Sequence, residues 1–312
     1  MPTTTATQRS VGPDDLDAVC EVIAECDLAT VGFLDFTRDE IATELAKATV
    51  ENTGWYDGQG ALVGYGWLKR VERTNQVELD LYLRPSSDPA LGPAMLATLE
   101  GRAAAVVTEV GHAAPWVYAT VYREDAVTQE WLRASGFSRQ TTFTRMRIDL
   151  DPGRPPEQPA SDVAVRRITE DADLRVAHEI EEESFLEHYG NVPTSYESWL
   201  ERLLDRGEDF RHVYLAELDG TPVGLLTTTR QFEEDEDAGY VRTLGVLPSA
   251  RGRGVGTALL RDCFARAHRD GRRAVLLHVD VANVTGALRV YESVGMRPVL
   301  EIDSWAKGER VD

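Results

Sequence analysis

The sequence predicts a two-domain protein of the α+β class. The chain has 312 residues, which exceeds the usual size of one compact domain. Each half shows the same order of hydrophobic patterns, namely helix, helix, strands, helix, strand, helix and strand. Between the halves, residues 151–159 contain four prolines and a glycine, which break helices and strand ladders. We therefore expect one domain over residues 1–150, a proline-rich linker over 151–162 and a second domain over 163–312.

Apolar side chains mark the elements of the first half. Leu16, Val19 and Val22 recur at helical spacing after Asp14, whose charge favours a helix N-terminus. The run from Val77 to Leu83 alternates apolar and polar residues, as a half-buried strand does. We expect helices over 13–29, 39–49, 91–107 and 127–134, and strands over 61–68, 77–83, 116–121 and 143–150.

The second half carries its own turn signals. Asp219 and Gly220 separate two apolar runs and form the strongest hairpin signal in the chain. Gly295 follows a helical pattern, as a helix C-cap does. We expect helices over 171–185, 196–205, 257–268 and 287–294, and strands over 213–218, 222–229, 240–246, 274–279 and 299–305.

The two halves align through three short landmarks, which indicates an internal duplication. The members of each pair lie about 160 residues apart. Chance similarity of short apolar segments is the alternative. The pairs are Leu62–Gly66 with Pro222–Leu226, Leu83–Pro85 with Val246–Pro248, and Ser135–Phe137 with Val294–Met296.

Composition narrows the function classes. The formal net charge is −20, from 53 acidic and 33 basic residues, and this excess argues against a nucleic acid partner because phosphates would be repelled. The same charge suits a cationic small substrate, although solubility alone also explains it.

Neither a membrane segment nor a metal site is evident. No apolar run approaches the roughly 18 residues of a membrane span, and residues 1–13 lack the basic start and apolar stretch of a signal peptide. Cys20, Cys26 and Cys263 form no metal-binding pattern and are expected to be small buried side chains. We expect a cytoplasmic protein without a metal or a membrane partner.

The segment from Leu244 to Leu260 predicts an anion site. An apolar strand pattern ends at Pro248, glycines follow at 252, 254 and 256, and a helical pattern begins after them. Glycines let the backbone approach a ligand closely, and the first amides of a helix have no partner within the helix. A phosphate or pyrophosphate fits such a loop. A structural turn without a ligand is the alternative.

Two common nucleotide motifs do not fit this loop. A Walker A loop ends in GK[ST], which is absent, and a dinucleotide fingerprint needs a glycine or alanine where Thr257 or Leu259 stands. The sequence instead has Arg251-x-x-Gly254-x-Gly256 shortly after Pro248.

This loop resembles the acetyl-CoA loop of the GNAT superfamily of N-acetyltransferases. A second segment, Asp280–Met296, resembles the family's segment with Asn, Ala, Leu-Tyr-Glu and Gly-Phe, and the two lie at the expected separation. Asn283 stands one residue farther from Tyr291 than in many members of the family. The resemblance covers residues 163–305.

The resemblance implies a three-layer α/β/α-like GNAT fold in each half, with a mixed, mostly antiparallel sheet flanked by helices. It also implies that the loop amides hold the pyrophosphate of coenzyme A and that the strand edge pairs with its pantetheine arm. Arg251 would contact a phosphate or lie in solvent. The implied cofactor-binding residues are Leu244, Val246, Arg251, Arg253, Gly254, Gly256, Thr257 and Asn283.

The implied reaction is acyl transfer from a thioester to an amine. A primary amine with a pKa near 10 must lose a proton before it attacks, so a base is needed, and an acid can protonate the departing thiolate. Tyr291 resembles the family's general acid, with an ordinary core aromatic as the alternative. The base is unknown, and Glu182, Glu183 and His188 are weak candidates. The acidic run 233–237 would hold a cationic acceptor or form a solvated turn.

The first half lacks the features of the loop. Laying Pro85 over Pro248 puts Asp88, Leu91 and Pro93 at the positions of Arg251, Gly254 and Gly256, and a second alignment puts Leu132 at Tyr291. A proline cannot donate a hydrogen bond, and an aspartate repels a phosphate. This half is expected to be a degenerate copy that does not bind the cofactor. A tandem chain of this kind is similar to the mycothiol-synthase-like branch of the superfamily.

Three functions stay open at this point. The first is an acetyl-CoA-dependent N-acetyltransferase that acts on a small amine, cationic or neutral, as a monomer or homodimer. The second is an acyl-CoA-binding sensor or interaction module without turnover. The third is a protein lysine or N-terminal acetyltransferase.

Overall fold

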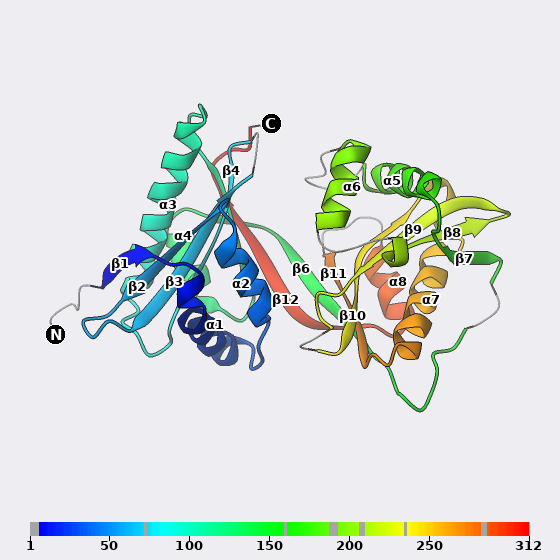
Figure 1. The fold of residues 1–312 in the computed structure, drawn as a ribbon, viewed down its shortest axis with the longest axis horizontal. Coiled ribbons are helices and arrows are strands. Elements are labelled where there is room, and N and C mark those ends of the chain that lie inside the picture. The colour runs from blue at the N-terminus through cyan, green and yellow to red at the C-terminus, as the bar shows by residue number, and fades with distance from the viewer. Residues whose placement is uncertain are drawn as a thin grey trace. The chain divides into compact units, whose positions relative to one another are not determined.

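The computed structural model describes residues 6–71, 74–158, 161–186, 193–205, 210–233, 236–281 and 286–311. The chain forms two compact units. Unit 1 comprises Met1–Phe143 and Glu301–Asp312, and unit 2 comprises Thr144–Leu300. Two strands contribute residues to both units, β6 (Ser138–Asp149) and β12 (Arg297–Lys307), drawn in green and red in Figure 1.

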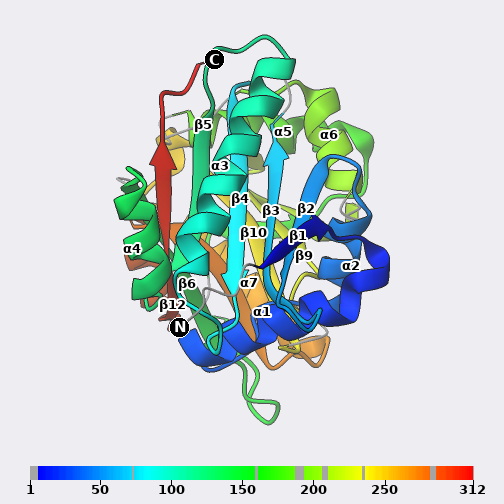
Figure 2. The same cartoon turned by 90° about the vertical axis from the view of Figure 1, so that its left-hand side faces the viewer.

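Unit 1 is a mixed sheet with helices on both faces. The strand order is β1-β2-β3-β4-β5-β12-β6, antiparallel at its start and parallel between β4 and β5. Leu79 and Leu81 pack under α3, which crosses the sheet in Figure 2, whereas Tyr65 and Tyr82 face α1. The elements are β1 (Thr7–Ser10), α1 (Leu16–Thr30), α2 (Arg38–Ala46), β2 (Val50–Tyr56), β3 (Leu62–Arg70), β4 (Gln76–Leu83), α3 (Leu91–Glu109), β5 (Trp116–Tyr122) and α4 (Ala126–Ala134).

Unit 2 repeats this architecture. Its strand order is β7-β8-β9-β10-β11-β6-β12, and its parallel pair is β10 with β11. One core lies between the sheet and α7, and another between the sheet and the helices α5 and α6. The elements are β7 (Val163–Arg167), α5 (Asp171–Phe185), α6 (Tyr196–Asp205), β8 (Val213–Leu218), β9 (Thr221–Thr229), β10 (Ala238–Val246), α7 (Val255–Arg269), β11 (Ala274–Asp280) and α8 (Ala287–Ser293).

The last strand of each half lies in a different place from the one the pattern suggests. The sequence places 143–150 and 299–305 as the closing strands of their own halves. In the structure, Met146 belongs to the core of unit 2, and Trp305 belongs to the core of unit 1. β12 pairs antiparallel with β5 from Ile302 to Lys307. Alternation predicts that a segment is a strand, but it does not choose the strand's partner.

When the chain is divided into its two compact units, the proline-rich segment consequently falls within unit 2. Residues 144–149, which precede it, lie in β6 next to β11, and the Leu150 amide donates to the carbonyl of Arg273 (2.7 Å). The prolines therefore mark the break between the two sequence repeats and not the break between the two packed units. Most other predicted elements lie within a few residues of the observed ones, whereas β1, β2 and β7 were not predicted.

No helix among the described residues is both long and apolar enough to span a bilayer. The described residues also hold no group of three or more metal-ligating side chains.

A buried carboxylate anchors β12 in unit 1. Asp303 is 2% exposed and accepts hydrogen bonds from Arg123 Nη2 (2.9 Å) and Thr142 Oγ1 (2.6 Å). Burial alone would raise the pKa of Asp303, but these hydrogen bonds and the charges of Arg123 and Arg139 lower the pKa below its ordinary value. The ionised carboxylate therefore stabilises the folded state.

We expect Asp303→Asn to lower the free energy of unfolding of unit 1 by about 2 kcal/mol at pH 7, because Arg123 loses its buried counter-charge. Since the folded-state pKa is lowered, the deficit is present above the unfolded-state pKa and shrinks as the pH falls below about 4. Thermal unfolding at several pH values measures it. Asp149→Asn on β6 is the control, because Asp149 is half exposed and its ion pairs contribute little. Equal effects of the two changes would contradict the anchoring role.

Candidate active site

The parallel strands of unit 2 pair only at their beginning. β10 pairs with β11 from Ala238 to Val241, opposite Ala274–Leu277, and then continues to Val246 paired with β9 alone. The register between β10 and β9 shifts between Val241 and Thr243, so one extra residue forms a bulge where the strands part. Past the bulge, β10 has no β11 residue paired with it.

The glycine loop begins directly after β10. Gly252 and Gly254 have φ values of +75° and +80°, a left-handed conformation that other residues adopt only with strain, and Gly254 is the N-cap of α7. A Cβ added at either position would meet nothing within 4 Å. The loop therefore presents bare backbone to open space.

The amides of this loop have no acceptor. None of the N–H groups of residues 252–257 has a hydrogen-bond partner among the described residues, and the first helical bond of α7 joins Ala258 N to Gly254 O (2.9 Å). The positive end of the helix dipole lies at the same place. Such a row of amides can hold an anion through backbone groups alone.

Arg251 anchors the start of the loop. Its guanidinium donates to the carbonyl oxygens of Val246 (Nε, 3.3 Å) and Ser184 (Nη2, 3.1 Å), which joins the end of β10 to the end of α5. The side chain is neither a solvated arginine nor directed wholly at a ligand. Its described contacts hold the two elements on either side of the site.

Tyr291 lies on α8 beside the loop. The neighbouring Val290 would approach a Cβ on Gly256 to 3.7 Å, and Tyr291 itself is 7% exposed. Burial raises the pKa of Tyr291 to about 12. Its hydroxyl has no hydrogen-bond partner among the described residues. The side chain packs in the core of unit 2 and keeps a proton available for donation at neutral pH.

The model of the acetyltransferase (GNAT) family matches residues 174–296. This range contains the parted strands, the glycine loop and Tyr291. This part of the chain is a GNAT acetyltransferase domain. The prediction that it is an N-acetyltransferase is thereby confirmed.

Relatives and solved structures agree with this assignment. The chain is 27% identical over 258 residues to a mycothiol acetyltransferase of Acidothermus cellulolyticus, over 77% of this chain and 74% of the relative. It is 32% identical over 180 residues to a mycothiol acetyltransferase of Frankia casuarinae and spans only 52% of that relative.

The fold extends across the whole chain. A GCN5-related N-acetyltransferase from Sphaerobacter thermophilus superposes with a TM-score of 0.80 at 24% identity, covering 97% of this chain and 95% of that one. A tandem GNAT protein from the clavulanic acid biosynthesis pathway gives 0.70 at 18% identity, covering 99% and 100%. The predicted α+β tandem GNAT fold of the mycothiol-synthase-like type is confirmed.

The candidate bases lie in different surroundings. Glu182 accepts hydrogen bonds from the backbone N (3.2 and 3.3 Å) and Oγ1 (3.2 Å) of Thr194, so it tethers the segment before α6. Glu183 is exposed at the end of α5. His188 and Asn283 lie outside the described residues. No contact of the GNAT site assigns the base to any of them.

The acidic run 233–237 is engaged by arginines. Glu233 pairs with Arg272 (2.7 Å), and Glu236 pairs with Arg147. Asp237 lies 3.4 Å from Arg272 as well, whereas residues 234 and 235 lie outside the described part. These contacts favour the structural interpretation of the run over a free cationic subsite.

A buried polar triad at the strand parting was missed from the sequence. His278 is the first residue of β11 beyond the pairing with β10. Its Nε2 accepts from Arg145 Nε (3.1 Å), because a guanidinium only donates, so the ring proton lies on Nδ1 and is donated to the Tyr240 hydroxyl (2.8 Å). The sequence signal that could have revealed this triad was the presence of His278 and Arg145 within otherwise apolar strands.

This triad cannot supply the base through His278. Burial, followed by the charges of Arg145 and Arg242, lowers the pKa of His278 to about 3. Both ring nitrogens are hydrogen-bonded, so neither is free to take a proton. The triad instead orients the Tyr240 hydroxyl on the sheet face opposite the α7 core.

The start of α3 in unit 1 differs from that of α7. Its N-cap is Ala90, so the structure places Ala90 and Gly92 at the positions for which the sequence alignment chose Leu91 and Pro93. The sequence alignment is shifted by one residue, because the turn between Pro85 and α3 is one residue shorter than the turn between Pro248 and α7.

The amides of this start are already used. The Ala90 amide donates to the carboxylate of Asp88 (2.9 Å), and the Leu91 amide donates to the backbone carbonyl of Asp88 (3.0 Å). The Gly92 amide donates to the preceding turn. A Cβ on Gly92 would lie 2.3 Å from the ring of Trp131, which covers the place. Unit 1 therefore offers no counterpart of the glycine cradle.

We expect the imidazole of His278 to show no titration between pH 5 and 9, because its folded-state pKa lies near 3 and not at the ordinary value of 6.5. Nitrogen-15 NMR of histidine-labelled protein measures this directly and should report a proton on Nδ1. A His278 resonance that titrates near pH 6.5 would contradict the buried triad, and His278→Gln identifies the resonance.

Proposed function

We propose that unit 2 transfers an acetyl group from acetyl-CoA to the amine of a small molecule by direct attack on the thioester. The chain is an N-acetyltransferase, and the finer statement rests on one observation. Unpartnered amides at residues 252–257 lie next to the parting of β10 and β11. This combination suits a ligand with an extended arm and a pyrophosphate.

The cofactor-binding residues fit coenzyme A by their chemistry. The amides of Arg253, Gly254, Gly256 and Thr257 would hold the pyrophosphate, and the β10 edge from Leu244 to Val246 would pair with the amides of the pantetheine arm. Asn283 remains a proposal outside the described residues. Arg251 would act by fixing the loop, with any phosphate contact made beyond its bonds to Val246 and Ser184.

Unit 1 would not bind the cofactor. Its helix N-terminus lacks free amides at Ala90, Leu91 and Gly92. The sequence alignment puts Leu132, a fully buried apolar residue, at the position of Tyr291. We therefore assign the acetyl transfer to unit 2 alone.

Tyr291 would act as the general acid. Acetyl-CoA supplies an activated acyl group, and the attacking amine must first lose a proton. The Tyr291 hydroxyl, protonated and without a described partner, can donate to the sulfur that departs. The base stays unassigned among Glu182, Glu183 and His188, acting directly or through water. The charge of −20 is compatible with a cationic acceptor and argues against nucleic acid.

We expect Tyr291→Phe to lower kcat by about 100-fold while the affinity for coenzyme A changes little, because only the proton donor is removed. The measurement is release of free thiol from acetyl-CoA with a panel of primary amines, together with calorimetry. Because the pKa lies near 12, wild-type kcat should not fall between pH 7 and 10. Equal loss of affinity and of kcat would make Tyr291 a packing residue, and no thiol release with any amine would favour a binding module.

We expect Gly256→Leu to weaken coenzyme A binding at least about 100-fold. A Cβ there lies 3.7 Å from Leu244 and from Val290, so a methyl fits but a larger side chain fills the gap beside the loop. Gly101→Leu in α3 is the matched control, because a Cβ there meets nothing within 4 Å. Calorimetry measures binding, and circular dichroism confirms folding. Wild-type affinity in Gly256→Leu would show that the cofactor binds elsewhere.

A further inference from the structure

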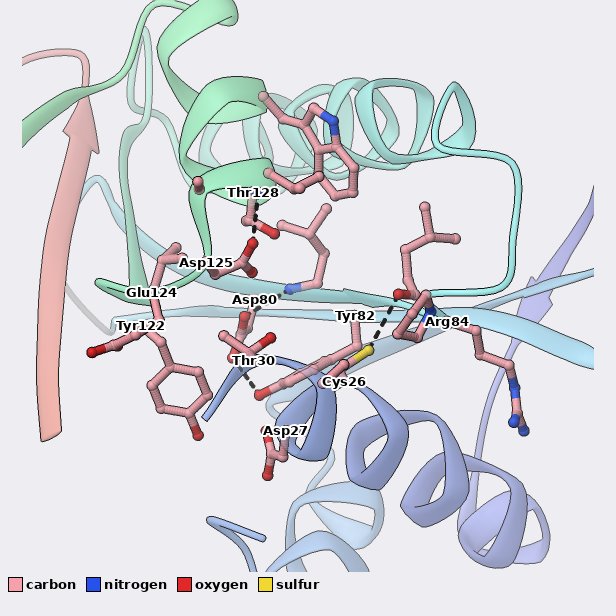
Figure 3. Close-up of a pocket in the computed structure, with 18 of the residues that line it drawn as sticks. Cys26, Asp27, Thr30, Asp80, Tyr82, Arg84, Tyr122, Glu124, Asp125 and Thr128 are labelled. Atoms are coloured by element: carbon pink, nitrogen blue, oxygen red, sulfur yellow. Dashed lines mark hydrogen bonds between the residues drawn. The ribbon is translucent and has the colours of Figure 1, made fainter. Parts of the chain in front are cut away.

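Unit 1 contains a cavity where its own parallel strands part. β4 pairs with β5 only from Gln76 to Leu79, opposite Trp116–Ala119. The continuations of both strands, with the end of α1 and the start of α4, line a cavity of about 650 Å³ (Figure 3). A cavity of this size accommodates a small organic molecule. All of its lining residues belong to unit 1.

Carboxylates dominate the charged part of the wall. They come from four places in the chain, namely Asp27, Asp35, Asp80 and the pair Glu124 and Asp125. Arg84 is the only lysine or arginine in the lining. Its guanidinium donates to the carbonyl of Leu62 (2.8 Å) and pairs with Glu21 and Glu25, which lie outside the lining, and in Figure 3 it points away from the labelled carboxylates.

Asp80 is the central group of this wall. It is the first β4 residue beyond the pairing with β5, and its carboxylate accepts from the Leu81 amide (2.8 Å) and the Tyr82 hydroxyl (2.7 Å). No cationic side chain among the described residues pairs with it. Burial, opposed by the two hydrogen bonds and reinforced by the charges of Glu78 and Asp27, raises the pKa of Asp80 to about 7. Asp80 is partly buried, and a carboxylate withdrawn from water without a counter-charge is costly unless a ligand supplies one.

Neutral groups donate hydrogen bonds to three of the other carboxylates. Asp27, 1% exposed, accepts from the Asp35 amide (2.9 Å), and the Tyr122 hydroxyl donates to Asp35 (3.0 Å). Asp125 accepts from the Thr128 amide (2.9 Å) at the start of α4. The described contacts fix the positions of these groups without neutralising Asp80.

Part of the remaining wall is apolar. Leu81, Leu83, Val121, Val127 and Ile302 contribute hydrocarbon surface. Trp131 covers the helix start at which a phosphate would otherwise bind.

We propose that unit 1 binds a small organic amine in its ammonium form, with the ammonium group at Asp80 and the carbon body along the apolar wall. The cavity supplies the space, and the unneutralised carboxylate selects the charge. The degenerate copy is then a second small-molecule site and not only a scaffold. This site is separate from the acetyl transfer proposed for unit 2 and does not depend on it.

Calorimetry at low ionic strength with 1,6-hexanediamine and with 1,6-hexanediol tests the proposal on the full chain. The two probes have the same length and differ in charge. We expect saturable binding of the diamine and none of the diol. Asp80→Asn keeps an oxygen that accepts from Tyr82 and should weaken the unit 1 binding at least tenfold. Glu109→Gln removes an exposed carboxylate from α3 and should leave the binding unchanged.

Several outcomes would overturn the proposal. Equal binding of the diamine and the diol, or no binding of the diamine, would contradict it. Unchanged binding of the diamine by Asp80→Asn would also contradict it, because the amine would then bind in unit 2. Thermal unfolding checks that Asp80→Asn folds, and Asp27→Asn provides a second variant if it does not. Binding of two coenzyme A molecules per chain would show that the cavity is a cofactor slot. Loss of acetyl transfer in Tyr291→Phe with unchanged diamine binding would separate the two sites.

Discussion

The early parting of a parallel strand pair is the constraint on which the rest of this structure depends. In unit 2 the pairing of β10 with β11 ends at Val241 and Leu277, and a bulge marks the place. A parallel ladder that ran to the strand ends would satisfy the backbone and leave no room for a ligand. Because it stops early, β10 runs unpaired on that side up to the glycine loop, and His278 is the first β11 residue beyond the pairing.

The same parting occurs in both units, and the side chains around it decide its chemistry. Unit 2 surrounds it with bare amides and a protonated tyrosine. Unit 1 ends its pairing at Leu79 and Ala119 and surrounds the opening with carboxylates and Trp131. The two units thus share a backbone geometry at the parting and differ in the charge of the groups around it.

The sequence predicts the loop well because its information is local. Glycines at 252 and 254 with positive φ, an unpartnered helix start and Tyr291 on a short helix all follow from neighbouring residues. What it could not predict depends on distant partners. The contact of Arg251 with Ser184, the triad of His278 with Arg145, and the placement of Trp305 in the first unit join residues far apart in the chain. The acidic run near Glu236 was ambiguous for the same reason, since its arginine partners lie on β6 and before β11.

The shared strands have a consequence for synthesis. Residues 302–307 of β12 pair with β5, so the sheet of unit 1 is completed only by residues that follow unit 2 in the chain. The part of unit 1 that precedes unit 2 must wait for these residues during synthesis, with Val117 and Val121 lacking their Trp305 neighbour meanwhile. Unit 2 requires residues from 144 onward and nothing beyond 300. The copy with the glycine loop can therefore finish folding before the older part of the nascent chain does.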